Sequence, residues 1–529
     1  METLSQKEPN KIMPSQSGFA KQLPRPARNV MSNWGGSLAY LFVAFFLSPF
    51  VVHHLGVSRY GVWVLIVSFT GYLGLLDLGV RGTVTYYVAK FHTQANHENA
   101  SRLASTAFVI FLILAFFVFA ISVIVGIVFS LWFHVQIYLN TNLQALLMLA
   151  GASIGCTLIG GVFGSVLSGL QRLDVVNAIE IGSTILKALL IVVCLEQGKG
   201  LIALATIQLI SSVLVGLTYA WMSWRLYPQL NVRFVLPDRT NVSLIASFGG
   251  YLFLLNVSTY IIMYTDSVVI GAVLSVAMVA FFAIASNLIT YSRGFITGVC
   301  YSISPWASSL DAQGNREKIE LLVLAVPRFA TILVLPVILT FVIRGKTFIG
   351  LWMGAQFAVP SGKVLQILSL ALFFSAANQV ATSITIGINR HRPVVFMNIA
   401  EAALNLTLSV ILAYQIGIDG VAWGTAIASL ISSLIFWPLY FRRIFGIRSS
   451  QYLISTWARP AVVVIPFALV SYVIDRTWYP PTLFLFFIQV AIALPVAILA
   501  FWFGCLSSTE RGSCMGRVFS LTVRADELA

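Results

Sequence analysis

Apolar runs about as long as a bilayer is thick dominate this sequence of 529 residues. A helix needs about 20 mostly apolar residues to cross the hydrocarbon core of a membrane, and fourteen runs meet that length. Only 9% of the residues are charged, which is too few to cover the surface of soluble domains with polar groups. These features argue against a soluble enzyme, a nucleic-acid-binding protein and a disordered scaffold.

The runs are too long and too continuous for the alternating strands of a membrane barrel, so each is predicted to be a helix. The connections between them are short and leave no room for a soluble domain. The predicted spans cover about 33–53, 60–80, 105–130, 143–169, 174–195, 200–225, 245–272, 276–305, 321–345, 360–387, 393–415, 419–442, 456–474 and 481–504. The chain is therefore predicted to be an all-α integral membrane protein with about 14 transmembrane helices.

The formal net charge of +14 is distributed unevenly between the two predicted sides of the membrane. If the N-terminus is cytoplasmic, 22 of the 32 Lys and Arg residues fall in cytoplasmic connections and tails, and six fall in outer connections. Loops rich in these residues stay in the cytoplasm, so both tails, 1–32 and 505–529, are predicted to be cytoplasmic. One outer connection is an exception because it carries Arg344, Lys346 and Lys363, which indicates either a local function or a misplaced span end.

The two halves of the chain resemble each other at a separation of about 214 to 221 residues. Gly-Leu-Gln-Arg at 169–172 matches Gly-Ile-Asn-Arg at 387–390. Six spans in each half give both halves the same orientation, and two such repeats enclose a central cavity in transporters. The predicted organisation is one bundle at 33–225, a parallel-related bundle at 245–442, and two extra helices at 456–504.

Ionisable and amide side chains inside the predicted spans are functional candidates, because charge in a membrane is costly. Arg293 lies deep in the eighth span, where a guanidinium must face protein, water or an anion, and it is the first candidate for a substrate contact. The alternative role for such residues is structural pairing, as between Asp77 and Arg81. The predicted substrate-binding residues are Arg293, Lys187, Asn287, Tyr291 and Glu401, and the ion-coupling candidates are Asp77, Glu180 and Asp266.

Other residues favour structural roles. Arg328 and Arg459 lie near cytoplasmic helix ends and are predicted to extend to the interface. Glycines recur over 151–169 at a spacing that favours close helix packing, with a flexing point during transport as the alternative. The sequence has no CxxC pair, no ligand neighbours for His53 and His54, no GxxxxGK[ST] loop, and no nucleophile paired with a base. We therefore expect no metal, no cofactor and no enzymatic activity, with transport driven by an H⁺ or Na⁺ gradient or by consumption of the product.

Two short runs in the N-terminal part of the chain are LGVSRYGVW at 55–63 and LLDLGV at 75–80. Together they resemble the N-terminal signature of Wzx-type polysaccharide and O-antigen flippases. These flippases belong to the multidrug/oligosaccharidyl-lipid/polysaccharide exporter superfamily. The resemblance implies a MATE-like fold with a cationic central cavity. It also implies that the chain moves an oligosaccharide linked to undecaprenyl pyrophosphate across the bacterial inner membrane, during synthesis of O-antigen or exopolysaccharide. The implied partners are membrane lipids and the machinery for polymerising and exporting the polysaccharide.

Three alternative functions share parts of this pattern. An ion-coupled multidrug exporter has the same fold, but the two extra spans and Arg293 argue against it. A lipid II flippase of peptidoglycan synthesis has the same number of spans and stays open as an alternative. A membrane glycosyltransferase or polymerase needs a large outer loop with catalytic residues, and the outer connections here are too short to supply one.

Overall fold

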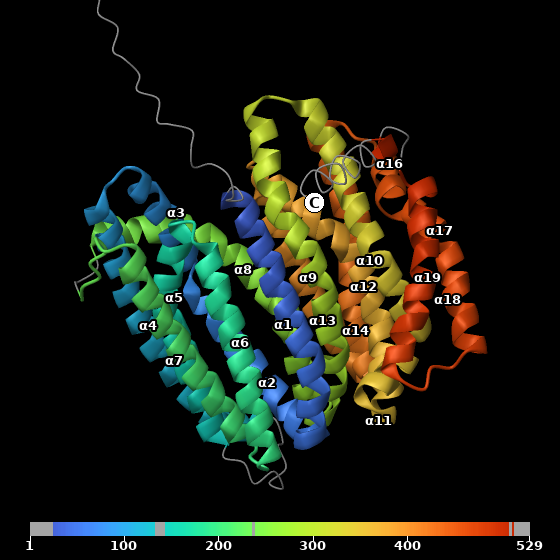
Figure 1. Cartoon of the computed structure of the whole chain (residues 1–529), viewed down its shortest axis with the longest axis horizontal. Helices are drawn as coiled ribbons and strands as arrows, with labels where there is room; N and C mark the ends of the chain where they lie inside the picture. The colour runs from blue at the N-terminus through green and yellow to red at the C-terminus, as the bar shows by residue number, and fades with distance from the viewer. Residues whose placement is uncertain (1–24, 133–142, 235–237, 507–509, 513–529) are drawn as a thin grey trace, which may run out of the picture.

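The computed structural model describes residues 25–132, 143–234, 238–506 and 510–512. Every regular element in these ranges is a helix (Figure 1). The first half contains α1 (Arg25–Leu55), α2 (Val57–Leu73), η1 (Gly74–Asp77), α3 (Val80–Thr93), α4 (His97–Trp132), α5 (Leu143–Gly169), α6 (Leu173–Glu196) and α7 (Leu201–Leu226). The second half contains α8 (Arg239–Val273), α9 (Val276–Ala312), α10 (Arg316–Met353), α11 (Ala355–Ala358), α12 (Pro360–Gly387), α13 (Arg392–Ile416), α14 (Ile418–Ile431), η3 (Ser432–Phe436) and α15 (Trp437–Phe445). The chain ends with α16 (Ser449–Leu453), η4 (Ile454–Ala458), α17 (Arg459–Val463), α18 (Ile465–Thr477) and α19 (Leu483–Gly504).

Each predicted span coincides with a helix or with a series of helices, the breaks being Leu78 and Gly79 in the second span and Val464 in the thirteenth. In the described part of the chain, 12 helices are long and apolar enough to cross a membrane. Helices α1 and α8 occupy the first and seventh predicted spans. The all-helical membrane fold is confirmed, and a total of fourteen spans is compatible with the structure and stays a prediction.

The repeated sequence motif forms the same turn in both halves. Gln171 and Asn389 have φ angles of 57° and 53°, which place both residues in the left-handed region. In each turn the next residue donates its backbone N–H five residues back, from Arg172 to Leu167 and from Arg390 to Thr385. This bond satisfies a carbonyl that the end of the helix leaves without a partner. The motif therefore repeats as structure, at the ends of α5 and α12.

The two halves meet along α1, α2, α8 and α9. In the first half, α5 packs against α4, α7 and α3, and in the second, α12 packs against α9, α10 and α14. Helix α2 contacts both α8 and α9, while α1 contacts α6 and α9. Figure 1 shows the blue and green helices of the first half beside the yellow and orange helices of the second, with α18 and α19 in red beyond them. The predicted boundaries of the bundles stay a prediction.

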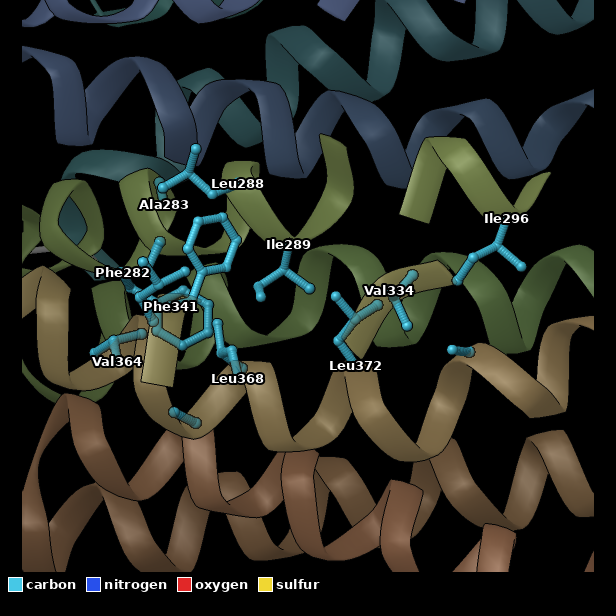
Figure 2. Close-up of a cluster of buried hydrophobic side chains, with 14 of the residues drawn as sticks. Phe282, Ala283, Leu288, Ile289, Ile296, Val334, Phe341, Val364, Leu368 and Leu372 are labelled. Carbon is cyan, nitrogen blue, oxygen red and sulfur yellow. The ribbon is translucent and has the colours of Figure 1, made fainter. Parts of the chain in front are cut away.

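The main apolar core lies in the second half and reaches α1 and α2. Figure 2 shows its centre, where Phe282 and Ile289 of α9 come together with Phe341 of α10 and Leu368 of α12. Lipid tails are as apolar as these side chains, so such a core gains stability from close packing and not from the exclusion of water.

Glycines of α5 lie where neighbouring helices come closest. A Cβ atom on Gly160 would lie 2.6 Å from the Cα atom of Gly216 on α7, and one on Gly151 would lie 2.1 Å from the hydroxyl of Ser122 on α4. No larger side chain fits in these positions without moving a helix. The predicted packing role of these glycines is confirmed.

The end of the ninth span was predicted wrongly. Helix α10 continues to Met353, well past the predicted end at 345, so Arg344 and Lys346 lie inside a helix and not in an outer connection. Arg344 is only 1% exposed. The apolar run ends before the helix does, so the predicted span was too short. Its last cations were therefore counted in the outer connection.

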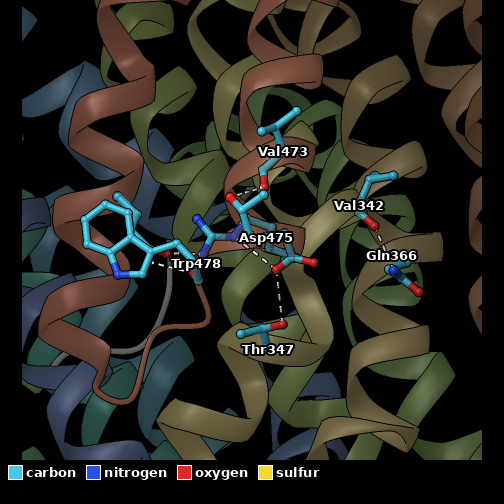
Figure 3. Close-up of polar contacts among 9 residues, drawn as sticks. Val342, Thr347, Gln366, Val473, Asp475 and Trp478 are labelled. Carbon is cyan, nitrogen blue, oxygen red and sulfur yellow. Dashed lines mark hydrogen bonds and ion pairs between the residues drawn. The ribbon is translucent and has the colours of Figure 1, made fainter.

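Arg344 joins α10 to the last two helices. Its Nε atom lies 3.3 Å from Oδ1 of Asp475 on α18, and its guanidinium also donates to the side-chain oxygen of Gln489 on α19. The guanidinium carbon lies 4.5 Å from the ring centre of Phe486. Thr347 donates to Asp475 as well (Figure 3). The extra pair of helices is thus fixed to the second half by a buried ionic contact.

Two further arginines fix the other end of α19. Arg328 is 9% exposed and its guanidinium donates to Glu510, and its extension to the interface stays a prediction. Arg459, which is exposed, donates from Nε to the carbonyl of Gly504 over 2.7 Å. The cation therefore caps the last carbonyls of the helix, where the helix dipole favours positive charge.

Candidate functional site

A partly buried guanidinium lies inside the second half of the molecule. Arg293 of α9 donates through one terminal nitrogen to the hydroxyl of Ser375 on α12, over 3.3 Å. Its Nε atom is buried and has no hydrogen-bond partner among the described residues. The carboxylates of Glu401 and Asp266 act on it electrostatically, but neither forms a direct ion pair with it in the described part of the chain. Part of its hydrogen-bonding capacity therefore remains open to a ligand.

Glu401 is held by a neighbouring helix and not by Arg293. It lies on α13 and accepts a hydrogen bond from the hydroxyl of Ser429 on α14, at 3.0 Å. Its match in the first half of the sequence, Glu180, likewise accepts from a hydroxyl, as described below. The paired glutamates of the repeat thus have similar local partners.

Asp266 lies in a cage of neutral oxygen atoms. Its carboxylate on α8 accepts from Ser409 of α13 at 3.2 Å and from Thr425 of α14 at 2.8 Å. Asn405 donates to the same threonine at 2.8 Å, and its amide oxygen is buried with no hydrogen-bond partner in the described structure. One carboxylate with hydroxyl and amide oxygens is a ligand set that suits a proton or a hard monovalent cation. Among the described residues, no cluster of three or more His, Cys, Asp or Glu side chains is placed to hold a metal.

A polar cavity of about 180 Å³ lies in the first half, between α5, α6 and α7. Glu180 and Lys187 of α6 line it, together with Arg81 of α3. Tyr219 donates its hydroxyl to Glu180 over 2.6 Å. Asp77 lies 3.4 Å from Arg81, so the predicted alternative role of Asp77, pairing with this arginine, is what the structure shows.

Asn287 and Tyr291 lie where α9 meets the first two helices. The amide of Asn287 donates to the hydroxyl of Tyr60 on α2 over 3.4 Å, and the hydroxyls of Tyr291 and Ser48 on α1 are 3.4 Å apart. A second cavity, of about 270 Å³, is lined by Ser48, Tyr60 and Lys187. Lys187 therefore borders both the polar cavity of the first half and the space between α1, α2 and α6.

An apolar cavity of about 510 Å³ is lined in part by α9, the helix that carries Arg293, although Arg293 itself does not form part of its wall. Tyr291 and Ser292 line it, directly before Arg293 in the sequence of α9. The rest of its wall comes from α1, α10 and α19, and includes Phe341, Phe486 and Phe487. The last helix of the chain thus forms part of the candidate site, and nothing in the sequence pattern indicates this.

The eight predicted site residues form three groups and not a single centre. Arg293, Glu401 and Asp266 lie in the second half, Lys187, Glu180 and Asp77 in the first, and Asn287 and Tyr291 between them. Their roles stay predictions. Sequence reasoning missed Tyr219, Ser409 and Thr425, because single hydroxyl side chains are common in apolar helices and carry no pattern of their own.

Residues 54–361 match the family described as polysaccharide biosynthesis protein. A putative O-antigen transporter of Shigella flexneri is 20% identical over 401 residues, covering 74% of this chain and 92% of the relative. The fold is similar to that of the lipid II flippase MurJ in an inward closed conformation, with a TM-score of 0.70, 14% identity, and coverage of 90% of this chain and 98% of the other.

An inward-facing multidrug resistance transporter, of the MATE family in the MOP superfamily, has a TM-score of 0.66 and 17% identity, and the match covers 79% of this chain and 98% of that one. These likenesses confirm the MATE-like fold of a multi-pass membrane protein. The family match extends over more than half of the chain, and the protein is therefore a member of the polysaccharide biosynthesis protein family.

Proposed function

We propose that this protein flips a lipid-linked oligosaccharide, carried on undecaprenyl pyrophosphate, across the bacterial inner membrane for the synthesis of a surface polysaccharide. The observation that carries this proposal is Arg293, whose buried Nε atom has no hydrogen-bond partner in the described structure, on a helix whose preceding residues Tyr291 and Ser292 line a large apolar cavity. A cargo with an anionic headgroup and a long hydrocarbon tail has the matching chemistry. Family membership supports the same class of cargo.

The guanidinium suits a diphosphate because its planar set of donors can bind two phosphate oxygens at once. A pyrophosphate cannot cross hydrocarbon without replacement of its hydration shell. Arg293 has one donor on Ser375 and an unpartnered Nε atom in the described structure, so it can donate to an anion without losing a buried ion pair. A guanidinium already paired with a carboxylate would have to break that pair first.

The apolar cavity suits the lipid tail because its wall belongs partly to the surface of the molecule. Phe42 of α1, Phe487 and Leu494 of α19 line it, and all three are exposed. In a membrane these side chains face hydrocarbon. A polyprenyl chain can therefore stay in contact with the bilayer while the headgroup lies near Arg293.

Transport requires the two halves to open alternately toward each side of the membrane, as in other transporters built from repeats. We place cation coupling at Asp266, because its oxygen cage suits H⁺ or Na⁺ and the orphaned oxygen of Asn405 completes it. In this arrangement the N- and C-termini are cytoplasmic, and the machinery for polymerising and exporting the polysaccharide consumes the flipped product.

The test is a set of Arg293 variants in the native host, compared at equal protein abundance. Arg293→Ala should abolish surface polysaccharide and cause lipid-linked oligosaccharide to accumulate on the cytoplasmic leaflet. Arg293→Lys should restore part of the transport, because it keeps the charge but loses the two-point contact. Arg102→Ala is the matched control, since that exposed arginine pairs with Glu98 on the same helix.

Normal polysaccharide and normal precursor levels in Arg293→Ala would refute the role of Arg293 in headgroup binding. Deletion of the whole protein tests the function itself. Accumulated lipid-linked repeat units support the flippase, whereas drug hypersensitivity with normal polysaccharide would identify a multidrug exporter. Accumulated peptidoglycan precursor would identify a lipid II flippase.

A further inference from the structure

The polar cavity of the first half has no role in the headgroup site proposed above. It is enclosed by α5, α6 and α7 and by the side chain of Arg81 from α3. Its volume of about 180 Å³ is far larger than one cation needs. It is on the scale of a single monosaccharide ring.

The cavity is hollow because two glycines form part of its wall. Gly160 and Gly161 both line it, on consecutive positions of α5. A Cβ atom on Gly160 would meet Gly216 of α7 at 2.6 Å, and one on Gly161 would meet the guanidinium of Arg81 at 2.4 Å. The absence of side chains at these positions brings α7 close and leaves space for Arg81 at the edge of the cavity.

The charges around the cavity balance. Arg81 is paired with Asp77, which leaves Glu180 and Lys187 as one charge of each sign on the same face of α6. Glu180 is held by the hydroxyl of Tyr219 at 2.6 Å, while the ammonium of Lys187 has no hydrogen bond or ion pair within the described structure. A cation here would be repelled by Arg81 and Lys187, and a phosphate would be repelled by Glu180. The balance favours a neutral ligand with many hydrogen-bonding groups.

The remaining wall is rich in groups that both donate and accept hydrogen bonds. Ser183 of α6 and Ser211 of α7 are hydrogen-bonded to each other at 2.8 Å, and Ser212 to Ser153 at 2.8 Å. Gln208 also lines the cavity. Hydroxyl pairs of this kind can exchange one partner for a sugar hydroxyl without leaving a buried group unsatisfied.

Charged groups in membrane helices must face water or a polar ligand. Glu180 is exposed in the structure although it lies within a membrane-spanning helix. Lys187 borders this cavity and also the space between α1, α2 and α6. Lys187 therefore lies between this cavity and the junction of the two halves, where the cargo would pass.

We propose that this cavity is a subsite for one neutral monosaccharide ring of the oligosaccharide, with Glu180 and Lys187 binding its hydroxyls while the pyrophosphate lies near Arg293 in the other half. The proposal rests on the proposed function, because it assigns a place to part of that cargo. It adds that sugar and headgroup are recognised in different halves of the molecule.

Cys156 makes this proposal testable without altering the protein. Its thiol lines the cavity, while Cys194, on α6, lines none of the cavities described above. The purified full-length protein is treated with a maleimide, and modification of each cysteine is followed by mass spectrometry of its peptide. Two probes are compared, the lipid-linked oligosaccharide extracted from a strain lacking the protein, and undecaprenyl pyrophosphate without sugar.

The oligosaccharide should slow modification of Cys156 severalfold and leave Cys194 unchanged, whereas undecaprenyl pyrophosphate should slow neither. Both probes should raise the thermal stability of the protein, because both carry the headgroup. If both stabilise the protein and Cys156 is not protected, or is protected equally by both, the sugar subsite is wrong and the flippase proposal stands. If neither stabilises the protein, the flippase proposal fails and the subsite fails with it.

A variant gives an independent measurement. Glu180→Gln should weaken binding of the lipid-linked oligosaccharide by on the order of tenfold, since it loses a charged hydrogen bond, and should leave binding of undecaprenyl pyrophosphate unchanged. Glu98→Gln, at an exposed position on α4, is the control and should change neither. Equal weakening for both probes in Glu180→Gln would overturn the sugar subsite.

Discussion

Two charged groups in the second half, the buried Asp266 and the partly buried Arg293, differ in how fully the protein satisfies them. The carboxylate accepts two hydroxyl hydrogen bonds from Ser409 and Thr425, whereas the guanidinium has an unpartnered Nε atom in the described structure. A buried donor without a partner is costly, so it suits a site completed by cargo. A carboxylate inside an oxygen cage is satisfied by a small cation as well as by hydroxyl groups.

At the residue scale we predict that Asp266→Asn uncouples transport from the cation gradient. The amide keeps the shape of the cage but removes the only carboxylate among the four side chains that form it. Flipping of purified lipid-linked oligosaccharide in proteoliposomes should then proceed at the same rate with and without a Na⁺ or H⁺ gradient. Ser409→Ala should keep the response but need a cation concentration higher by roughly tenfold or less.

Asp77→Asn is the informative comparison, because its sequence pattern also makes it a coupling candidate. In the structure Asp77 is paired with Arg81, so we expect this variant to keep its response to the gradient. The opposite result would contradict this assignment. If Asp77→Asn loses its response to the gradient and Asp266→Asn keeps it, coupling belongs to the first half and not to the second.

The sequence was sufficient to find the charges within the membrane-spanning helices but not their partners. Glu180, Arg293 and Glu401 stand out because ionisable groups are rare in apolar runs. Tyr219 and Thr425, which bind two of the predicted carboxylates, do not stand out, since the register between helices decides which hydroxyl meets which acid. That register depends on the packing of α6 against α7 and of α8 against α14, and hydropathy does not encode it.

Among the elements, α10 has the most interactions with the last two helices of the chain. Arg344 is almost fully buried and contacts both α18 and α19. We predict that Arg344→Ala destabilises the protein in mild detergent by about 3 kcal/mol, because removal of one partner leaves a buried charge uncompensated. The measurement is the free energy of unfolding from denaturant titration, or the loss of monodisperse protein on heating.

The control for this prediction is Arg102→Ala. Arg102 and Glu98 form an ion pair with both side chains more than half exposed, at 64% and 74%, and such pairs contribute less than about 1 kcal/mol. If the two variants lose equal stability, the contact between α10 and the last two helices is not what stabilises this part of the fold.

The α5–α7 contact gives a second prediction at the scale of elements. Gly160→Leu should separate these helices, since even a Cβ atom would lie 2.6 Å from Gly216, and overpacking of this kind typically costs about 1–3 kcal/mol. Gly182→Leu on α6 is the matched control, because a Cβ atom there meets nothing within 4 Å. Loss of folded protein on heating should therefore occur at lower temperature for Gly160→Leu alone.

The helices themselves were predictable because apolar length determines them. All fourteen predicted runs coincide with helices, and the repeated turn at Gln171 and Asn389 was visible as a sequence motif. The end of α10 was not predictable from hydropathy, since Arg344 and Lys346 interrupt the apolar run while the helix continues to Met353. Arg344 forms a buried ion pair with a helix distant in sequence, and Lys346 is exposed on the helix surface, so both charges are accommodated without ending the helix.

For the whole molecule, the distribution of cations predicts the orientation in the membrane. A reporter that works only in the cytoplasm should be active when it is fused after Ala529. Alkaline phosphatase fused at the same position should be inactive. The matched fusion follows Gly198, in the turn between α6 and α7, where alkaline phosphatase should be active. Strong phosphatase activity at the C-terminus would reverse the orientation and with it the proposed direction of transport.

The contact between the two halves follows α2 along its length. A Cβ atom on Gly61 would lie 2.0 Å from the backbone oxygen of Val276, at the turn between α8 and α9, and one on Gly71 would lie 2.5 Å from the ring of Tyr264. Tyr72 and Thr265 are joined by a hydrogen bond between their hydroxyls. Such close approach lets α2 separate from α8 and α9 without unfolding either half, because small residues leave no side chains interlocked.

We therefore predict that linking α2 to α8 stops transport. In a Tyr72→Cys, Thr265→Cys variant, a short bismaleimide with a reducible spacer should reduce flipping to the background rate, and cleavage of the spacer should restore it. Linkage within one helix, in Glu98→Cys, Arg102→Cys, should leave the rate unchanged, since it does not join the two halves. An inactive linked protein would show that transport requires the two halves to rock against each other. Normal flipping in that protein would mean that cargo crosses without separation along α2, and that the cavities lined by Tyr291 and Glu180 exchange cargo by another route.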